Sequence, residues 1–151
     1  MEFPTGFFYV LYLRIMKKII TLLLVISTVA CSNESSFKKA EDAQDAGREF
    51  IRASLDGNYE KAKYYLLGDS TNRYLLERWK SSYDNLSKDE KDKYKDADII
   101  VLDLHRLNDS VTSYKYFNSY KKDTTTIKVM RVHGEWVVDL KEVMNMNKDV
   151  K

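Results

Sequence analysis

The 151-residue sequence predicts an α+β fold in which three or four helices come first and an antiparallel sheet of about four strands follows. Between residues 37 and 96, apolar side chains recur at steps of three and four, which is the spacing of amphipathic helices. From residue 98 onward, apolar and polar residues alternate, and β-branched and aromatic residues are frequent, as in half-buried strands. Helices followed by hairpin-connected strands are typical of an α+β domain.

The first predicted helix covers residues 37–55. Gly57 ends it, and Asn58 can cap a short second helix that runs to Gly68. The expected buried side of the first helix carries Ala43, Ala46, Phe50, Ile51 and Ser54.

A third helix is predicted to open at Asp69 or Ser70. Ser87 and Glu90 have the spacing of a capping box, so a short fourth helix follows, and the charged residues 88–96 form its solvated face. One side of the third helix carries Leu75, Leu76, Trp79, Tyr83 and Leu86. We expect Trp79 to belong to the core.

Four strands are predicted in the second half of the chain, joined by short turns rich in Asn, Asp, Ser and Gly. In the last hairpin, Gly134 supplies the tight connection. The predicted strands cover residues 98–107, 111–120, 124–132 and 136–140.

Composition restricts the function classes. A chain with 44% hydrophobic and 32% charged residues is an ordinary globular one. The formal net charge of +2 arises entirely before Cys31, so the folded part is neutral and nucleic-acid binding is not expected. One cysteine and two histidines cannot build a zinc site, and we expect no metal and no cofactor.

The N-terminal region has the layout of a secretory signal. Met16 and two lysines form a basic start, residues 19–29 are apolar, and Ala30 precedes Cys31. The apolar stretch is too short to cross a bilayer, which takes about 20 residues. "TVAC" resembles the lipobox of bacterial lipoprotein precursors, with Thr28 in place of the usual Leu or Val.

This resemblance implies that residues 16–30 are a signal peptide and that Cys31 receives fatty acyl groups such as palmitate. Residues 31–37 then form the lipidated tether, and the membrane is a partner through the lipid on Cys31. The expected location is the cell envelope, on the outer membrane of a Gram-negative bacterium, with the membrane face left open. The alternative is a free cysteine buried in a short hydrophobic helix.

Residues 1–15 precede an already complete signal. We interpret them as a mis-annotated extension, with translation beginning at Met16. The alternative is an unusually long basic region of the signal.

Residues 38–141 resemble the nuclear-transport-factor-2-like (cystatin-like) superfamily, in the form found in small uncharacterised bacterial lipoproteins. The segment "AGREFIRASLDGNYEKAKYYL" resembles the start of such domains, and "IKVMRVHGEWVVDL" resembles their closing hairpin. The resemblance implies a cone-shaped domain in which the curved sheet wraps the first helix. Residues 142–151 are then a polar tail.

Enzymes of this superfamily place acids, histidine or tyrosine inside the cone. The corresponding candidates here are Asp103 and His105 on the first strand, and Tyr114 and Tyr116 on the second. On the other interpretation, Asp103 and His105 face solvent, because Ile100, Leu102 and Leu104 alternate with them, and the tyrosines serve the sheet.

Three functions follow from these observations. The one we favour is a membrane-anchored, non-catalytic domain that binds a small apolar ligand or an envelope protein. The second is a small isomerase- or dehydratase-type enzyme that uses the cone cavity. The third is a structural module that forms a homodimer through its sheet face. No catalytic residue is assigned, because the sequence shows no Ser-His-Asp order and no phosphate-binding loop.

Overall fold

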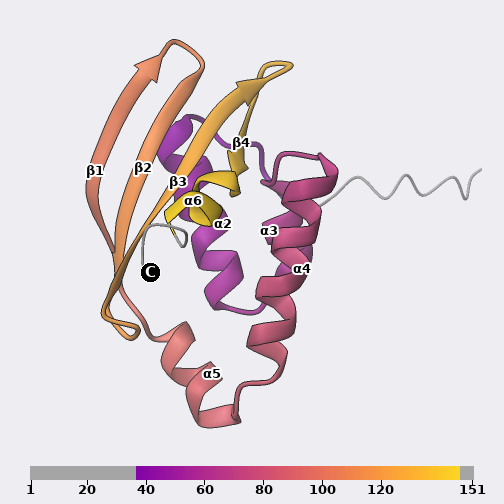
Figure 1. The fold of residues 1–151 in the computed structure, drawn as a ribbon, viewed down its shortest axis with the longest axis vertical. Coiled ribbons are helices and arrows are strands. Elements are labelled where there is room, and N and C mark those ends of the chain that lie inside the picture. Colours follow the sequence, from indigo (N-terminus) through magenta and orange to yellow (C-terminus); the bar gives the residue numbers. More distant parts are fainter. Residues whose placement is uncertain (1–36, 147–151) are drawn as a thin grey trace, which may run out of the picture. The chain divides into compact units, whose positions relative to one another are not determined.

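A four-stranded antiparallel sheet curves around one long helix in the computed structural model, which describes residues 37–146 (Figure 1). The predicted α+β class, with helices before the sheet, is confirmed. The helices are α2 (Ala43–Leu55), α3 (Tyr59–Tyr64), α4 (Ser70–Asp84), α5 (Lys88–Lys95) and α6 (Lys141–Met146). The strands are β1 (Ile99–Asn108), β2 (Val111–Asn118), β3 (Asp123–Val132) and β4 (Glu135–Asp139).

Side-chain caps fix where the helices begin. Helix α2 starts at residue 43, later than the periodicity suggested, because Asp42 has an extended backbone and its carboxylate accepts from the N–H of Asp45 at 2.7 Å. Asn58 caps α3, as predicted. The predicted capping box of α5 is present, with Ser87 and Glu90 bonded reciprocally.

The core lies between α2 and the inner face of the sheet. Every residue predicted for the buried side of α2 is buried. Gly47 allows the helix to approach β2 closely, because a Cβ atom at this position would lie 2.6 Å from the ring of Tyr114. The sheet contributes residues that are completely buried: Tyr114, Ile127, Val129 and Val138.

The strands follow one another in the order β1-β2-β3-β4, so β1 and β4 are the edges. The edge of β4 is partly covered, because the N–H of Val138 donates to the carbonyl of Tyr65 at 2.7 Å and its carbonyl accepts from Leu67. Within residues 37–146, nothing pairs with the corresponding edge of β1.

A buried polar network ties the start of α4 to the end of β4. The side-chain amide of Asn72, with no exposed surface, donates to Asp69 at 2.9 Å and to Asp139 at 3.1 Å. Its oxygen accepts from the N–H of Leu140 at 2.7 Å. Lys141 completes this Asn72 network with an ion pair to Asp69 at 3.0 Å.

The domain continues beyond residue 141, where the sequence analysis began the polar tail. Residues 141–146 form α6, and its Val143 packs against the core. Six residues are fewer than two helical turns, so no periodicity marks this helix in the sequence.

Among residues 37–146, no helix is long and apolar enough to cross a membrane. The predicted signal peptide, Cys31 and the interpretation of residues 1–15 all lie outside the described residues.

Candidate ligand-binding cavity

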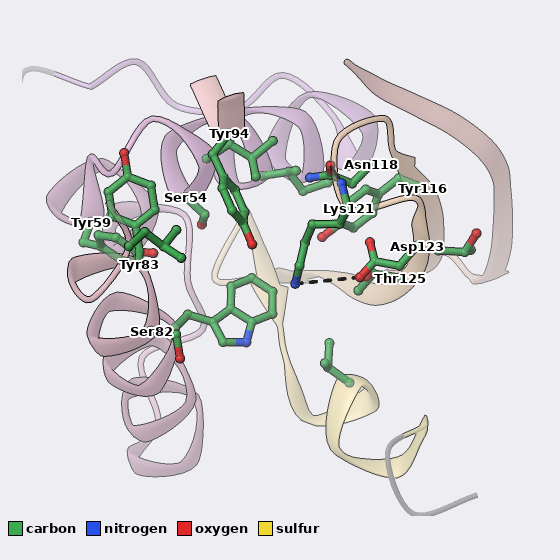
Figure 2. A pocket seen from close by; sticks show the side chains of 16 residues that line it. Ser54, Tyr59, Ser82, Tyr83, Tyr94, Tyr116, Asn118, Lys121, Asp123 and Thr125 are labelled. Atoms are coloured by element: carbon green, nitrogen blue, oxygen red, sulfur yellow. Dashed lines mark hydrogen bonds and ion pairs between the residues drawn. The ribbon is translucent and has the colours of Figure 1, made fainter. Parts of the chain in front are cut away.

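A cavity of about 580 Å³ lies beside the end of α2, and Figure 2 shows the side chains that line it. Helices α2 to α6, strands β2 and β3 and the turn between these strands all contribute to its wall. The lining residues are Ile51, Ser54, Leu55, Tyr59, Trp79, Ser82, Tyr83, Leu86, Tyr94, Tyr116, Asn118, Lys121, Asp123, Thr124, Thr125 and Val143.

A row of tyrosines, which we call the tyrosine row, lies along one side of the cavity, and all its members except Tyr120 line the cavity. Tyr59 meets Tyr83 edge to face at a ring-centroid distance of 5.9 Å, Tyr83 meets Tyr94 at 6.1 Å, and Tyr94 meets Tyr120 at 5.2 Å. The row therefore links α3, α4, α5 and the β2–β3 turn. Gly57, with φ of +75°, leaves room for it, because a Cβ atom there would lie 2.5 Å from the Tyr83 ring.

Trp79 contributes a large aromatic surface from α4. Its ring is half-buried and packs against Phe50 of α2 at a centroid distance of 6.0 Å. Trp79 and Tyr83 are four residues apart on α4, so both side chains lie on the same side of the helix. The prediction that Trp79 belongs to the core is confirmed in part: it packs against the core and also lines the cavity.

The β2–β3 turn carries the only basic residue among the described residues of the lining. The buried side chain of Asn118 holds this turn, because its oxygen accepts from the N–H groups of Tyr120 and Lys121, both at 2.9 Å. Lys122 takes a left-handed conformation with φ of +57°. Lys121 thus extends into the cavity, with its Nζ 3.7 Å from Oδ2 of Asp123 (Figure 2).

The buried tyrosines of the lining are neutral hydrogen-bonding groups. Burial raises the pKa of Tyr59, of Tyr83 and of Tyr116, so all three keep their protons at neutral pH. The hydroxyls of Tyr94 and Tyr116 point into the cavity (Figure 2).

The charges of the lining cancel, since Lys121 and Asp123 are the only charged residues that the described part of the chain places there. Within the described ranges, no group of three His, Cys, Asp or Glu residues could hold a metal ion. The lining thus combines aromatic faces, hydroxyls, an amide and one balanced ion pair. Such a lining suits an uncharged molecule with both apolar and hydrogen-bonding parts.

The structure separates the four candidate residues of the sequence analysis. Tyr116 lines the cavity. Tyr114 is next to it on the same face of β2 but is fully buried outside the lining, and its hydroxyl has no hydrogen-bond partner among the described residues. Asp103 and His105 lie opposite Lys115 and Ser113 of β2, on the other face of the sheet.

A β-bulge explains why the alternation along β1 was misleading. The register shifts between Val101 and Asp103, so Val101 lies opposite Tyr116 and Leu104 lies opposite Tyr114. Ile100 is therefore on the opposite face from Leu104, although a regular strand would put both on one face. The predicted apolar side of β1 does not exist as a single surface.

Sequence reasoning did not find most of the cavity. The tyrosines at positions 59, 83 and 94 come from three different helices, and Lys121 comes from a turn. The four-residue spacing of Trp79 and Tyr83 predicts that both lie on one side of a helix. That side could equally line a cavity or pack in the core. Only tertiary packing separates these two cases.

No protein-family model matches the chain, and no curated protein matches it either. Among solved structures, the chain is similar to an NTF-2 like protein of unknown function from Shewanella oneidensis MR-1. The two share 13% sequence identity, with a TM-score of 0.44, over 62% of this chain and 88% of that chain.

Proposed function

We propose that this chain is a lipid-anchored protein of the bacterial cell envelope whose domain binds a small neutral amphipathic molecule in the cavity beside Trp79. The observation that carries the proposal is the cavity itself, whose volume of about 580 Å³ lies in the range of small-molecule sites, about 300–1,000 Å³.

The chemistry of the lining supports this class of ligand. Trp79 and the tyrosine row offer flat apolar surfaces, on which a ring or a chain of CH groups packs well. Asn118, Thr125 and the tyrosine hydroxyls offer hydrogen bonds to the polar edge of such a ligand. A strongly charged ligand fits less well, because Lys121 and Asp123 already balance each other.

Binding fits this cavity better than catalysis. Its one carboxylate among the described residues, Asp123, faces the ammonium group of Lys121, and its buried tyrosines hold their protons firmly. The pair that an enzyme would use, Asp103 and His105, lies on β1 outside the lining.

The lipid anchor is supported by the sequence alone. The basic start, the apolar stretch and the small residue before Cys31 together resemble a lipobox. We expect Cys31→Ala to abolish labelling by a fatty-acid analogue in a bacterial host. Undiminished labelling of this variant would contradict the anchor and leave the ligand proposal standing.

The ligand proposal is tested by native mass spectrometry of residues 32–151, exported to the envelope without the anchor and purified gently. We expect the monomer to carry an additional mass. Trp79→Ala and Lys121→Met should lose it, whereas Tyr74→Ala should retain it, because Tyr74 is 60% exposed on the same helix and outside the cavity.

Circular dichroism identifies any variant that has lost its fold. If Trp79→Ala unfolds the domain, Lys121→Met still tests the proposal, because Lys121 is half-exposed on a turn and its replacement should leave the fold intact. A wild-type domain without additional mass would contradict the proposal. So would an additional mass that both cavity variants retain.

A further inference from the structure

Strand β1 exposes an unusual amount of apolar surface for an edge strand. Ile100 is 48% exposed, Leu102 52%, Leu107 49%, Val101 38% and Leu104 37%. In the described part of the chain, only one other large hydrophobic residue, a tyrosine on α4, is exposed to this degree. A long apolar edge strand is a template for pairing with another strand, because its outer N–H and C=O groups lack a partner.

Symmetry restricts how two copies could pair through this edge. In an antiparallel pair related by a two-fold axis, each copy keeps the same face toward the same side of the combined sheet. Directly opposite residues point to the same side of a sheet. The two-fold axis must therefore lie at a residue whose copy in the other chain is directly opposite it. Only a few registers along β1 satisfy this condition.

Charge selects one of these registers. With the axis at Asp103, two carboxylates would be opposed, and with the axis at Arg106, two guanidinium groups would be opposed. With the axis at Leu102, Asp103 would have to lie opposite Val101, which points to the other side of the sheet. With the axis at His105, Asp103 would face Leu107. An axis at Leu104 instead places Asp103 opposite His105 twice, with an apolar residue between the two pairs.

The local geometry of β1 fits that register. Asp103 and His105 lie on the same face of the sheet, since they oppose Lys115 and Ser113 of β2, while Leu104 lies on the other face. The two register shifts fall on either side of Asp103–Arg106, so these central residues form a regular stretch of strand. Asp103 and His105 can pair whether the imidazole is neutral or charged, because either form can donate an N–H to the carboxylate.

We propose that the occupant of this edge is a second copy of this chain. The two β1 strands pair antiparallel about a two-fold axis at Leu104 and form one continuous eight-stranded sheet. Asp103 of each copy bonds to His105 of the other, and Leu104 packs against Leu104. This edge pairing differs from a dimer through the sheet face, and it does not depend on the ligand proposed for the cavity.

Single-cysteine cross-linking tests the register. The fragment Ser36–Lys151 contains all the described elements and the whole core, and Cys31 lies outside it, so an introduced cysteine is its only thiol. We expect Leu104→Cys to form a disulfide-linked dimer on mild oxidation. Leu107→Cys is a matched control, since the two copies of residue 107 would lie about 20 Å apart and a disulfide needs Cα atoms within about 7 Å.

Charge reversal tests the pairing itself, with sedimentation equilibrium as the readout. We expect Asp103→Lys to weaken the dimer at least tenfold, because an ammonium group in place of the carboxylate would face His105 of the second copy. The double variant Asp103→Lys/His105→Asp restores the opposite charges and should restore the dimer. A purely structural role of Asp103 would not produce this rescue.

Three results would overturn the proposal. The first is a wild-type fragment that stays monomeric at every concentration. If that monomer binds to phosphatidylcholine vesicles, the apolar edge of β1 serves a lipid surface and not a second copy. The second is equal cross-linking of Leu104→Cys and Leu107→Cys. The third is a dimer that Asp103→Lys leaves unchanged.

Discussion

The inner face of the sheet has two halves that differ in what covers them. The closed half is Tyr114, Ile127, Val129 and Val138, all fully buried. The open half is Tyr116, Asn118, Lys121 and Thr125, which line the cavity. The boundary falls between neighbouring positions of β2, because Tyr114 lies opposite Ile127 and Tyr116 lies opposite Thr125.

The covering helix makes the difference between the two halves. Over Tyr114, α2 presents Gly47 and comes into direct contact with the sheet. Toward Tyr116, the helix presents Ser54 and then ends at Leu55, and α4 reaches the cavity only through Trp79 and the residues after it. We therefore expect the closed half to provide most of the stability of the domain and the proposed ligand to occupy the open half.

The Asn72 network should give the largest effect on stability. Asn72→Ala leaves the buried N–H of Leu140 without its partner, which costs about 1–3 kcal/mol. It also removes one donor, worth about 1 kcal/mol, from the carboxylate of Asp139, which keeps its bond from the N–H of Lys141. We expect the free energy of unfolding to fall by about 2–4 kcal/mol in urea denaturation. Asn85→Ala, at the exposed end of the same helix, should change it by less than about 0.5 kcal/mol. Equal effects of the two variants would show that the Asn72 network contributes no special stability.

Gly47 should be nearly as sensitive. Gly47→Ala places a methyl group 2.6 Å from the buried Tyr114 ring, and overpacking of this kind costs about 1–3 kcal/mol. Gly68→Ala is the control, because no atom lies within 4 Å of its Cβ position. Thermal unfolding of both variants measures the difference, and an unchanged melting temperature for Gly47→Ala would show that α2 and β2 are not in tight contact.

The two neighbouring tyrosines of β2 should respond differently to the loss of their hydroxyl groups. Tyr114→Phe removes a buried hydroxyl that has no partner among the described residues, so it should be neutral or stabilise the domain by up to about 1 kcal/mol. Tyr116→Phe removes a hydroxyl that points into the open cavity, so it should change the stability by less than about 0.5 kcal/mol. Chemical denaturation of the two variants side by side makes the comparison, and a loss of stability in Tyr114→Phe would contradict it.

The smallest expected effect is a loss of stability at low pH that comes from protonation of Asp69. The N–H of Asn72, and then the ammonium group of Lys141, lower the pKa of Asp69 from 3.8 to about 2. A lowered pKa in the folded state adds stability above pH 3.8, and this stability is lost as the pH falls toward 2. Because Asp69 is 38% exposed, the effect is small and weakens in salt.

Asp69→Asn isolates this charge, because asparagine can still cap α4. We expect the variant to lose less stability than the wild type between about pH 4 and about pH 2. If wild type and variant lose the same amount of stability over this pH range, the effect does not come from Asp69.

The sequence was sufficient to predict the order of helices and strands and the buried side of α2. Caps, glycines and hydrophobic periodicity are local features, and they locate elements well. Asn58 and the capping box at Ser87 show this most clearly, since both act as their spacing predicts.

The sequence was not sufficient for the site. Whether Trp79 is wholly core or also lines a cavity depends on how far α4 stands from the sheet, and no local pattern encodes that distance. The bulge near Leu102 changes which residues of β1 share a face, and alternation cannot detect an inserted residue. These two features account for the candidates that the structure separated and for the residues that were missed.

A crystal structure of residues 32–151, purified from the native envelope, tests the division of the sheet most directly. We expect an open cavity with ordered non-protein density beside Trp79, Tyr94 and Lys121, and a closed half packed around Tyr114. A cavity filled by its own side chains, or one that holds only water, would contradict it.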